Sequence, residues 1–323
     1  MEVSVIIPNY NGINYIEKCL ESVLLSDMDT EIIVVDNGSM DGSAELVERK
    51  YPQVKLIRFS ENRGFCAAVN EGIRACATPY VFLLNNDAAV MPDTVLKLYR
   101  MLSENQGVFS CQALMIKMSD EKIVDSAGDY YCALGWAFSL GKDRLREDLE
   151  RYTNRRRVFS ACAGAAMYRR DILDKIGLFD ENHFAYLEDV DIGYRARLYG
   201  YENYILKDAV VLHAGSGATG SRYNEFKVYH SSRNSIYLIY KNMPSGQVLL
   251  NFPLLTAGFL IKTLYFAKKG FGKTYLRGLT DGFRLCFTKS GRGHKIVFDK
   301  EKLGTYVRIE FLLLLNVIRR LAA

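Results

Sequence analysis

The sequence predicts an α/β fold whose mostly parallel sheet is covered by helices on both faces. Within the first 85 residues, four short apolar runs alternate with three segments of helical spacing. The apolar runs are continuous and rich in β-branched residues, which is typical of strands that are buried on both sides. With 323 residues, 49% of them hydrophobic, the chain is long enough for one large α/β domain with an appendage, or for two domains.

The elements can be placed in order along the chain. The first run is stopped by Pro8, and Ser43 is a candidate N-cap for the second helix. We expect strands at 3–7, 31–35, 54–59 and 80–84, with helices at 13–25, 41–50 and 66–76 between them. Beyond residue 90 we expect a helix at 92–105, a strand at 108–116, a charged solvated segment at 142–157, a strand at 158–168, helices at 171–176 and 184–200, and a strand at 204–212.

Charge is distributed unevenly between the two ends of the chain. Residues 241–323 carry fifteen Lys and Arg against four Asp and Glu, a formal charge of +11, which leaves −6 on residues 1–240. This asymmetry predicts two segments with different partners. The seven cysteines are scattered without metal-binding or CxxC spacing, and no signal-peptide pattern is visible. We therefore expect free thiols and a cytoplasmic location.

Polar residues follow several of the predicted strands at the point where each strand ends. Asn9, Asp36 and the triplet Asn85-Asn86-Asp87 occupy such positions. In an open α/β sheet, ligands bind at the carboxyl ends of the strands, and a carboxylate there can hold a divalent cation. Asp36 could accept hydrogen bonds from a nucleotide base or ribose. Asp36 and the triplet can also be explained as residues of ordinary turns, because Asn and Asp favour turn geometry.

A second cluster of polar residues places three carboxylates within four positions. Glu188, Asp189 and Asp191 lie where a helix is expected to begin. They could be an acidic first turn that interacts favourably with the helix dipole. Alternatively, one of them could be a general base that faces the ligand crevice.

Two further side chains have both a structural and a functional interpretation. His213 ends an apolar strand candidate and could complete a metal site opposite Asp87, or it could be a hydrogen-bonded structural histidine. Arg233 could bind a diphosphate through two hydrogen bonds, or form a surface ion pair.

The order of these motifs resembles the family 2 glycosyltransferases, and within them the bacterial rhamnosyltransferase and galactofuranosyltransferase-like branch. The resemblance extends over about residues 1–240, and its specificity comes from six motifs in the right order. These are VSVIIPNYNG, VVDNGSMDGS, NRGFCAAVN, FLLNNDA, FDENHFAYLEDVDIGYRARLYGY and HAGSG. It implies the GT-A fold, with a nucleotide-sugar-binding half at 1–110 and an acceptor or catalytic half at 111–240.

The resemblance also implies roles for matching positions. Asn85-Asn86-Asp87 stands at the family's metal-binding DxD position with Asn85 in place of the first Asp, so Asp87, with His213, is expected to bind the metal. Asp189 stands at the position of the catalytic base, with Glu188 beside it. The residues expected to bind the donor are Pro8, Asn9, Asp36, Arg63, Asn70, Asn85, Asn86 and Arg233.

The implied reaction is transfer of a sugar from a nucleotide diphosphate donor, with inversion at the anomeric carbon. It requires a base on one face of the sugar and a stabilised diphosphate on the other, which Asp189 and a bound Mg²⁺ or Mn²⁺ would provide. The implied donor is dTDP-rhamnose or a UDP-sugar, and the implied acceptor is a glycan or lipid-linked saccharide of the cell surface. A non-catalytic nucleotide-sugar-binding scaffold is an alternative. A nucleotidyltransferase is another, although PNYNG lacks the Gly-rich basic loop typical of that class.

Residues 241–323 are expected to form a basic, amphipathic helical tail. The apolar segments 247–270 and 305–320 are interrupted by or end in basic residues. Such helices suit the surface of an anionic membrane, here its inner face. Packing on the catalytic domain or a contact between two copies of the chain is the alternative, whereas nucleic acid is not expected, because the cations lie among long aliphatic runs.

Overall fold

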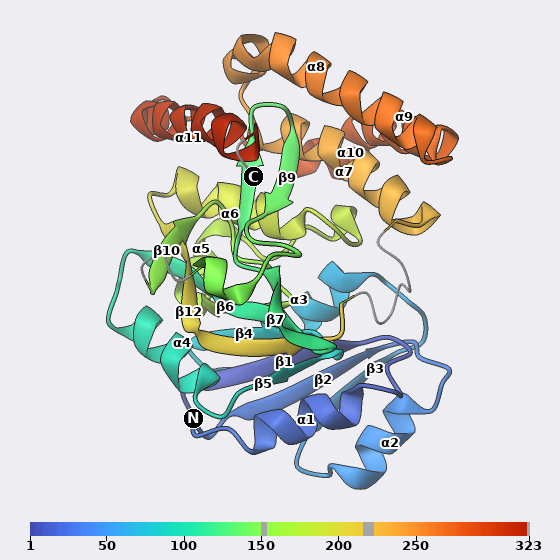
Figure 1. Ribbon diagram of the computed structural model, residues 1–323, viewed down its shortest axis with the longest axis vertical. Helices are drawn as coiled ribbons and strands as arrows, with labels where there is room; N and C mark the ends of the chain where they lie inside the picture. The colour runs from blue at the N-terminus through green and yellow to red at the C-terminus, as the bar shows by residue number, and fades with distance from the viewer. Residues whose placement is uncertain (150–153, 216–222, 322–323) are drawn as a thin grey trace.

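The computed structural model describes residues 1–149, 154–215 and 223–321 (Figure 1). Its central sheet follows the order β10-β12-β6-β11-β4-β1-β2-β3, with β5 added beside β12 and β7 beside β6. A separate hairpin is formed by β8 and β9. The strands are β1 Val3–Asn9, β2 Glu31–Asn37, β3 Lys55–Phe59, β4 Tyr80–Leu84, β5 Ala88–Val90, β6 Val108–Lys117, β7 Asp120–Ser126, β8 Asp129–Cys132, β9 Trp136–Ser139, β10 Arg155–Val158, β11 Ala165–Arg169 and β12 Glu202–His213.

The parallel arrangement expected for the first 85 residues is confirmed. Strands β4, β1, β2 and β3 are parallel neighbours, and Asn9 is the register partner of Asp36. The polar ends of β1 and β2 therefore lie side by side. Farther along the sheet, β6 and β12 are also parallel, but β11 is inserted antiparallel between β6 and β4.

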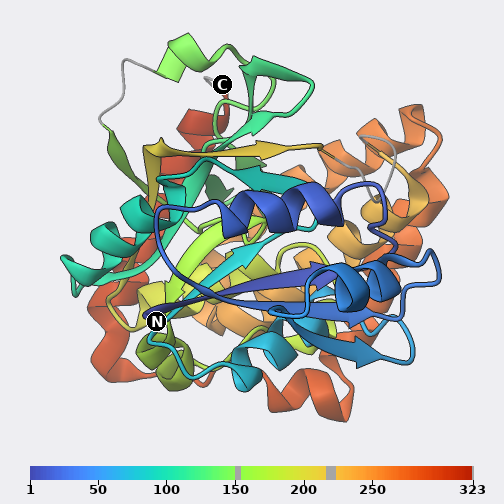
Figure 2. The same cartoon turned by 90° about the horizontal axis from the view of Figure 1, so that it is seen from below.

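Helices cover both faces of this sheet, as the sequence predicted. Apolar residues of α1, α2 and α4 pack on one face, where Figure 2 shows α1 and α2 lying over the strands. Residues of α3, α5 and α6 pack on the other face. The helices are α1 Ile16–Leu24, α2 Ser43–Lys50, α3 Phe65–Ala75, α4 Thr94–Ser103, α5 Arg170–Ile176, α6 Glu188–Leu198, α7 Glu225–Asn242, α8 Ser245–Lys268, α9 Gly272–Cys286, α10 Lys289–Gly293 and α11 Leu303–Leu321.

The strand expected at 158–168 is wrong in part. Val158 ends β10 and β11 begins only at Ala165, because the chain between them turns. Two contacts hold this turn against the sheet. The backbone N–H of Cys162 donates to the side chain of Gln112 at 2.7 Å, and the N–H of Asn85 donates to the carbonyl of Gly164 at 2.9 Å.

Two helices begin at other residues than the sequence predicted. Ser43 is the first residue of α2 rather than its N-cap, because Gly42 (φ +86°) precedes it and the Asp41 carboxylate accepts from the Ser43 N–H at 3.0 Å. The helix expected from 184 begins at Glu188. The residues before it include three non-glycine residues with positive φ, so they cannot continue a right-handed helix.

The charged segment 142–157 is exposed over much of its length, in agreement with its composition. It contains a short 3₁₀ helix, Arg146–Leu149, and the start of β10. Residues 150–153 of this segment, and the last two residues of the HAGSG motif, lie outside the described residues. All seven cysteines are free thiols, as expected.

The C-terminal region is helical and gathers at the end of the molecule opposite α1 and α2 (Figure 1). It is attached through a core that α8 and α11 share with α6, α7 and the β8–β9 hairpin. Polar contacts add to this attachment: Gln247 and Asn251 of α8 each donate to Glu310 of α11 at 2.8 Å. Although Pro253 lies inside it, α8 is continuous over 24 residues, and by length and composition it could cross a membrane.

Candidate active site at the carboxyl edge of the sheet

Asn9 links the ends of three parallel strands. Its side-chain NH₂ donates to Asp36 at 2.9 Å and to the hydroxyl of Ser43 at 2.8 Å. Its side-chain oxygen accepts from Asn86 at 2.8 Å. Asp36, which is buried, also accepts from the backbone N–H of Ser39 at 3.1 Å. Asn9, Asp36 and Asn86 therefore form one buried network directly behind Pro8.

Arg63 and Asn70 lie in different surroundings. The Arg63 side chain is exposed and its guanidinium lies 4.7 Å from the centre of the Phe59 ring. The Asn70 amide is buried and is fully engaged with the chain, because it donates to the carbonyl of Phe179 at 2.8 Å and accepts from the N–H of the same residue at 3.0 Å. Arg63 can reach a ligand, whereas Asn70 holds α3 against the segment before α6.

The structure brings together the two residues expected to bind a metal. Nε2 of His213 lies 3.1 Å from Oδ1 of Asp87 and 3.4 Å from Nδ2 of Asn85. On the other side of the ring, Nδ1 donates to Asp125 at 2.8 Å. Asp125, on β7, was not anticipated from the sequence. A second carboxylate that orients an imidazole in this way is a common feature of histidine metal ligands.

Charge interactions at this cluster are strong. Burial disfavours a charged His213, but its hydrogen bonds to Asp125 and Asp87 raise its pKa to about 9. Burial likewise opposes a charged Asp125, yet His213 and Lys142 hold its pKa below the ordinary value, and Lys142 lies 3.1 Å from its carboxylate. Burial, followed by the charge of Lys142, lowers the pKa of Lys227 on α7, while the charges of Asp125 and Asp87 oppose that shift. Basic groups and carboxylates thus meet at the end of β4.

The set of ligand atoms around Asp87 suits a divalent cation. A carboxylate and an imidazole nitrogen face one another, and the amide of Asn85 is adjacent. Oxygen and imidazole ligands are those that Mn²⁺ and similar ions accept. The residues present therefore fit a metal, with Asp87 and His213 as its candidate ligands.

The expected base lies at the start of α6. Glu188 and Asp189 are the first two residues of this helix, and Asp189 accepts from the backbone N–H of Val190 at 2.7 Å. Asp189 also forms a hydrogen bond with Asp129 of β8, which the sequence did not predict. The sulfur of Cys162 and one carboxylate oxygen each of Asp129 and Asp189 all lie within 4.8 Å of one another.

The pKa values of these carboxyl groups are raised. Burial, followed by the charge of Asp189, raises the pKa of Glu188 to about 8. Burial and the same neighbour raise the pKa of Asp129 well above its ordinary value. Burial also raises the pKa of Asp189, although the hydrogen bond from Asp129 opposes that shift. A carboxylate whose pKa is raised is a stronger base than an ordinary one.

The third carboxylate of the acidic run has a structural role. Asp191 is fully buried and lies 2.9 Å from both Lys241 and Arg195. Lys241 also lies 2.8 Å from Asp180. This buried ion network connects α6 to α7. In the acidic first turn, Asp189 is thus the candidate base, whereas Asp191 has a structural role.

Arg233 lies on α7 and contacts the segment that precedes α6. Its Nη1 donates to the carbonyl of Asn182 and to the side chain of Asn234, both at 2.8 Å. This guanidinium is therefore at least partly occupied by contacts within the chain.

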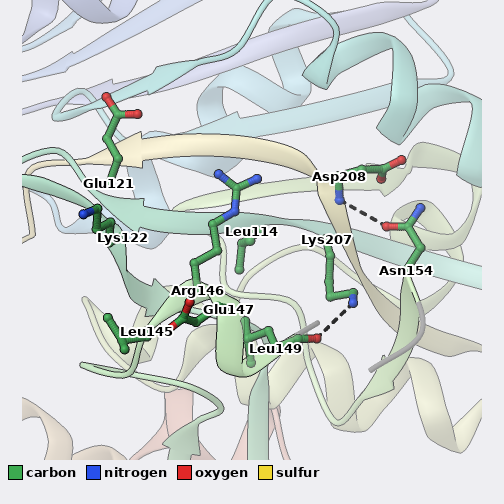
Figure 3. Close-up of a pocket in the computed structure, with 10 residues that line it drawn as sticks. All are labelled: Leu114, Glu121, Lys122, Leu145, Arg146, Glu147, Leu149, Asn154, Lys207 and Asp208. Carbon is green, nitrogen blue, oxygen red and sulfur yellow. Dashed lines mark hydrogen bonds between the residues drawn. The ribbon is translucent and has the colours of Figure 1, made fainter. Parts of the chain in front are cut away.

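A cavity of about 840 Å³ lies away from this edge of the sheet (Figure 3). Its walls mix three basic and three acidic side chains, and none of the candidate site residues lines it. Lys207 donates to the carbonyl of Leu149 at 2.9 Å, and Asn154 accepts from the N–H of Asp208 at 3.1 Å.

A known sequence family matches this chain over residues 4–177, and it is described as glycosyl transferase family 2. The chain belongs to this family. An N-acetylglucosaminyl-diphospho-decaprenol L-rhamnosyltransferase of Mycobacterium tuberculosis is 25% identical over 261 residues, which is 72% of this chain and 83% of that protein. An uncharacterized glycosyltransferase of a Nostoc species is 30% identical over 54% of this chain and 53% of its own length. The chain is thus a glycosyltransferase that resembles the rhamnosyltransferase branch.

Solved structures confirm the GT-A fold of this glycosyltransferase. The mannosyltransferase PcManGT from Pyrobaculum calidifontis, in complex with GDP-Man and Mn²⁺, superposes with a TM-score of 0.55 at 18% identity, covering 96% of this chain and 87% of that one. TarS of S. aureus in complex with UDP-GlcNAc gives a TM-score of 0.57 at 17% identity, covering 97% of this chain and 88% of that one. GalNAc-T7 with UDP, GalNAc and Mn²⁺ gives 0.57 at 16% identity, covering 74% of this chain and 47% of that one.

Proposed function

We propose that this glycosyltransferase moves a sugar from a nucleotide diphosphate donor to an acceptor hydroxyl with inversion. The observation that carries the proposal is the proximity of two carboxylate centres. The turn between β10 and β11 contacts both of them. One ligand atom of Cys162 lies within 4.8 Å of those of Asp129 and Asp189, and the carbonyl of Gly164 accepts from the N–H of Asn85 at 2.9 Å. The candidate base and the candidate metal site therefore adjoin the same short turn, which suits a single displacement.

In this mechanism Asp189 accepts the proton of the acceptor hydroxyl as it attacks the anomeric carbon. Its raised pKa makes it a stronger base than an ordinary aspartate, which favours that role. Asp129, protonated, donates a hydrogen bond to Asp189 and keeps the carboxylate oriented. Glu188, with a pKa of about 8, is largely neutral at pH 7 and does not compete for the proton.

On the leaving-group side, Asp87 and His213 would hold the divalent cation, and Asp125 fixes the orientation of the His213 ring. When bound, Mg²⁺ or Mn²⁺ would supply the positive charge that stabilises the departing diphosphate. Lys142 and Lys227 add positive charge beside the same carboxylates. Two of the structural neighbours were solved with Mn²⁺, which supports a metal of this class.

For the donor, we propose dTDP-rhamnose first and a UDP-sugar second. The rhamnosyltransferase relative supports the first, and the UDP-containing neighbours support the second. Residues 1–110 would form the donor-binding half, with Pro8, Asn9 and Asp36 at the nucleoside, and residues 111–240 the acceptor half. Asn85, Asn86, Arg63 and Arg233 would approach the diphosphate, and Asn70 would support them from α3.

For the acceptor, we propose a lipid-linked saccharide of cell-surface polysaccharide synthesis at the cytoplasmic face of the membrane. The name of the rhamnosyltransferase relative describes such an acceptor. The helical tail supports this proposal, because α8 and α11 bury one side against the domain and expose large apolar side chains on the other. Its +11 formal charge is suited to anionic lipid headgroups. A dimer formed through the same face is the alternative.

Two other functions would use the same fold. A scaffold that binds nucleotide sugars without catalysis would not require the hydrogen-bonded pair of Asp129 and Asp189 beside the metal ligands. A nucleotidyltransferase would require a basic, glycine-rich loop after β1, where this chain has Asn9-Tyr10-Asn11-Gly12. Transfer therefore explains more of the observed side chains than either alternative.

A donor panel tests this proposal. Thermal stabilisation of the protein is measured with nucleoside diphosphates and their sugars, with and without Mn²⁺, and donor hydrolysis is followed for each. We expect dTDP-rhamnose or a UDP-sugar to raise the Tm in a metal-dependent way and to be turned over. Stabilisation without turnover of any donor, in the presence of a lipid-linked acceptor, would favour the scaffold instead.

A further inference from the structure

The segment directly before the candidate base has an unusual backbone. We call residues 183–187 the base loop. Phe184, Tyr186 and Leu187 have φ values of +62°, +72° and +67°, although none is glycine. Phe184 is the centre of a γ-turn (ψ −63°), in which the N–H of Ala185 donates to the carbonyl of His183 at 2.7 Å. Strain of this kind persists only where the surroundings impose it.

One buried side chain of α7 contacts most of this loop. The Asn234 side-chain NH₂ lies 2.8, 2.9 and 2.8 Å from the carbonyl oxygens of His183, Ala185 and Tyr186. Asn234 is fully buried, and its own side-chain oxygen accepts from Nη1 of Arg233 at 2.8 Å. An amide carries only two N–H hydrogens, so the three carbonyls share them. The carbonyls of three loop residues therefore converge on a single donor group.

Other contacts of the base loop with α7 involve its aromatic rings. The Phe184 ring stacks on His230, with centroids 5.2 Å apart, and the Tyr186 ring lies 6.1 Å from Phe226. These ring contacts orient side chains, whereas the bonds of Asn234 determine the path of the backbone. Arg233 fixes the Asn234 amide and also binds the carbonyl of Asn182, one residue before the loop.

We propose that Asn234 is a positioning residue for catalysis, which holds the base loop in its strained conformation and thereby places Glu188 and Asp189. This inference rests on the proposed role of Asp189. Without the Asn234 amide, Phe184, Tyr186 and Leu187 are free to return to negative φ. Because Leu187 is the N-cap of α6, that change moves the first turn of the helix, which carries both carboxylates. The donor-binding side chains on β1 and β2 do not contact Asn234 and keep their positions.

The test compares Asn234→Ala with the matched variant Asn316→Ala in the full-length protein. Asn316 is also buried, donates to one backbone carbonyl (Tyr131, 2.8 Å) and accepts from an arginine Nη1 (Arg319, 2.9 Å), but it does not contact the base loop. We expect Asn234→Ala to lower kcat for sugar transfer at least tenfold while the Kd for the nucleoside diphosphate stays within about twofold. Hydrogen exchange at the Ala185 amide should become faster. Asn316→Ala should have wild-type kcat and wild-type exchange at Ala185.

A rescue experiment adds a readout that a general loss of stability would not change. Glycine accepts positive φ without strain, so Leu187→Gly in the Asn234→Ala background should restore part of kcat. The inference is overturned if Asn234→Ala keeps wild-type kcat, or if Asn316→Ala loses as much. If Asn234→Ala does not fold, Asn234→Ser, which keeps one donor, is measured for the same losses, and wild-type kcat in that variant counts against the inference.

The two proposals can fail separately. If Asp189→Asn retains full transfer, the proposed role of Asp189 as the base is wrong, and exchange at Ala185 still decides whether Asn234 holds the loop. If Asp189→Asn is inactive but Asn234→Ala is fully active, only the positioning role of Asn234 is wrong.

Discussion

Glu188 and Asp191 are one helical turn apart, yet their environments favour opposite charge states. Burial would raise the pKa of either group. For Asp191 the charges of Lys241 and Arg195 outweigh burial and hold its pKa well below the ordinary value. Glu188 has no such cation, and Asp189 raises its pKa further, to about 8. The acidic run therefore contains an anchor that is always charged and a group that titrates near neutral pH.

The raised pKa of Glu188 predicts a specific pH dependence of stability. The folded protein holds a proton on Glu188 that the unfolded chain releases at about pH 4.5. The contribution of this proton to the free energy of unfolding is therefore complete below pH 4.5. It is lost as the pH rises through about 8, at up to about 1.4 kcal/mol per pH unit. We expect Glu188→Gln to gain Tm relative to wild type between pH 6 and pH 8.5. Parallel Tm curves for the two proteins over that range would contradict the assignment.

Asp125 offers a test of the candidate metal site that does not depend on turnover. Replacing it by Asn removes the carboxylate that orients the His213 ring, so Mn²⁺ affinity measured by calorimetry should fall about tenfold to hundredfold. Asp120, on the same strand but exposed, is the matched control, and Asp120→Asn should leave the Mn²⁺ affinity unchanged. Equal affinity in Asp125→Asn and wild type would place the metal elsewhere.

At the scale of residues, the sequence predicts the part of the site that follows local patterns. Asn9, Asp36 and Asp87 were found because each follows an apolar run, and the structure brings the first two into hydrogen-bonding contact. Asp125 and Asp129 lie in short strands that have no distinct periodicity. Their proximity to His213 and Asp189 depends on strand order and on a separate hairpin, which spacing along the chain does not reveal.

At the scale of elements, α2 and α3 each follow a glycine with positive φ, but the two glycines differ in ψ (1° and 165°) and in their surroundings. Gly42 and Gly64 precede these helices with φ of +86° and +87°. A Cβ on Gly42 would meet nothing within 4 Å, whereas a Cβ on Gly64 would lie 2.7 Å from the backbone carbonyl oxygen of Phe184. Gly64 therefore allows the base loop to approach the start of α3.

This pair of glycines gives a matched prediction. Gly42→Ala should lower the free energy of unfolding only by the cost of positive φ, about 1–2 kcal/mol. Gly64 has a φ and ψ that essentially only glycine adopts, and an alanine there also clashes with backbone. We therefore expect Gly64→Ala to cost about 1–3 kcal/mol more, measured by urea denaturation, together with reduced transfer. Equal losses in the two variants would mean that the base loop moves freely away from α3.

The elements that were predicted correctly are those with strong local signals. The first 85 residues have continuous apolar strands and periodic helices, and their order and parallel pairing are confirmed. The strand expected at 158–168 was too long because small apolar residues in a buried turn look like a strand. The start of α6 was missed because positive φ at Phe184, Tyr186 and Leu187 is imposed by tertiary contacts rather than by residue type.

At the scale of the whole molecule, the basic tail and the catalytic domain share a core. Leu255 of α8 and Leu313 of α11 are buried with residues of α6 and β8, so deleting the tail would expose the domain itself. The opposite side of these helices presents large apolar side chains, among them Leu264 (65% exposed) and Phe311 (74% exposed). Substitution of these exposed residues is therefore a better test of membrane association than deletion.

We expect Leu264→Ser with Phe311→Ser to weaken sedimentation with anionic phospholipid vesicles while the Tm stays close to that of the wild type. The reason is that both side chains would leave the acyl region of the bilayer without disturbing the core. Leu25→Ser, at an equally exposed leucine of the segment after α1 (75%), is the control and should bind vesicles normally. Unchanged sedimentation, with loss of a dimer on gel filtration, would assign this face to self-association.

The most direct measurement concerns Asp189 itself. Sugar transfer and nucleoside diphosphate affinity are measured side by side for the wild type and Asp189→Asn, which keeps the shape of the side chain but removes the base. We predict that transfer falls about 10²- to 10⁴-fold while nucleotide affinity and Tm are retained. Transfer at the wild-type rate in Asp189→Asn would contradict the mechanism and remove Asp189 from it.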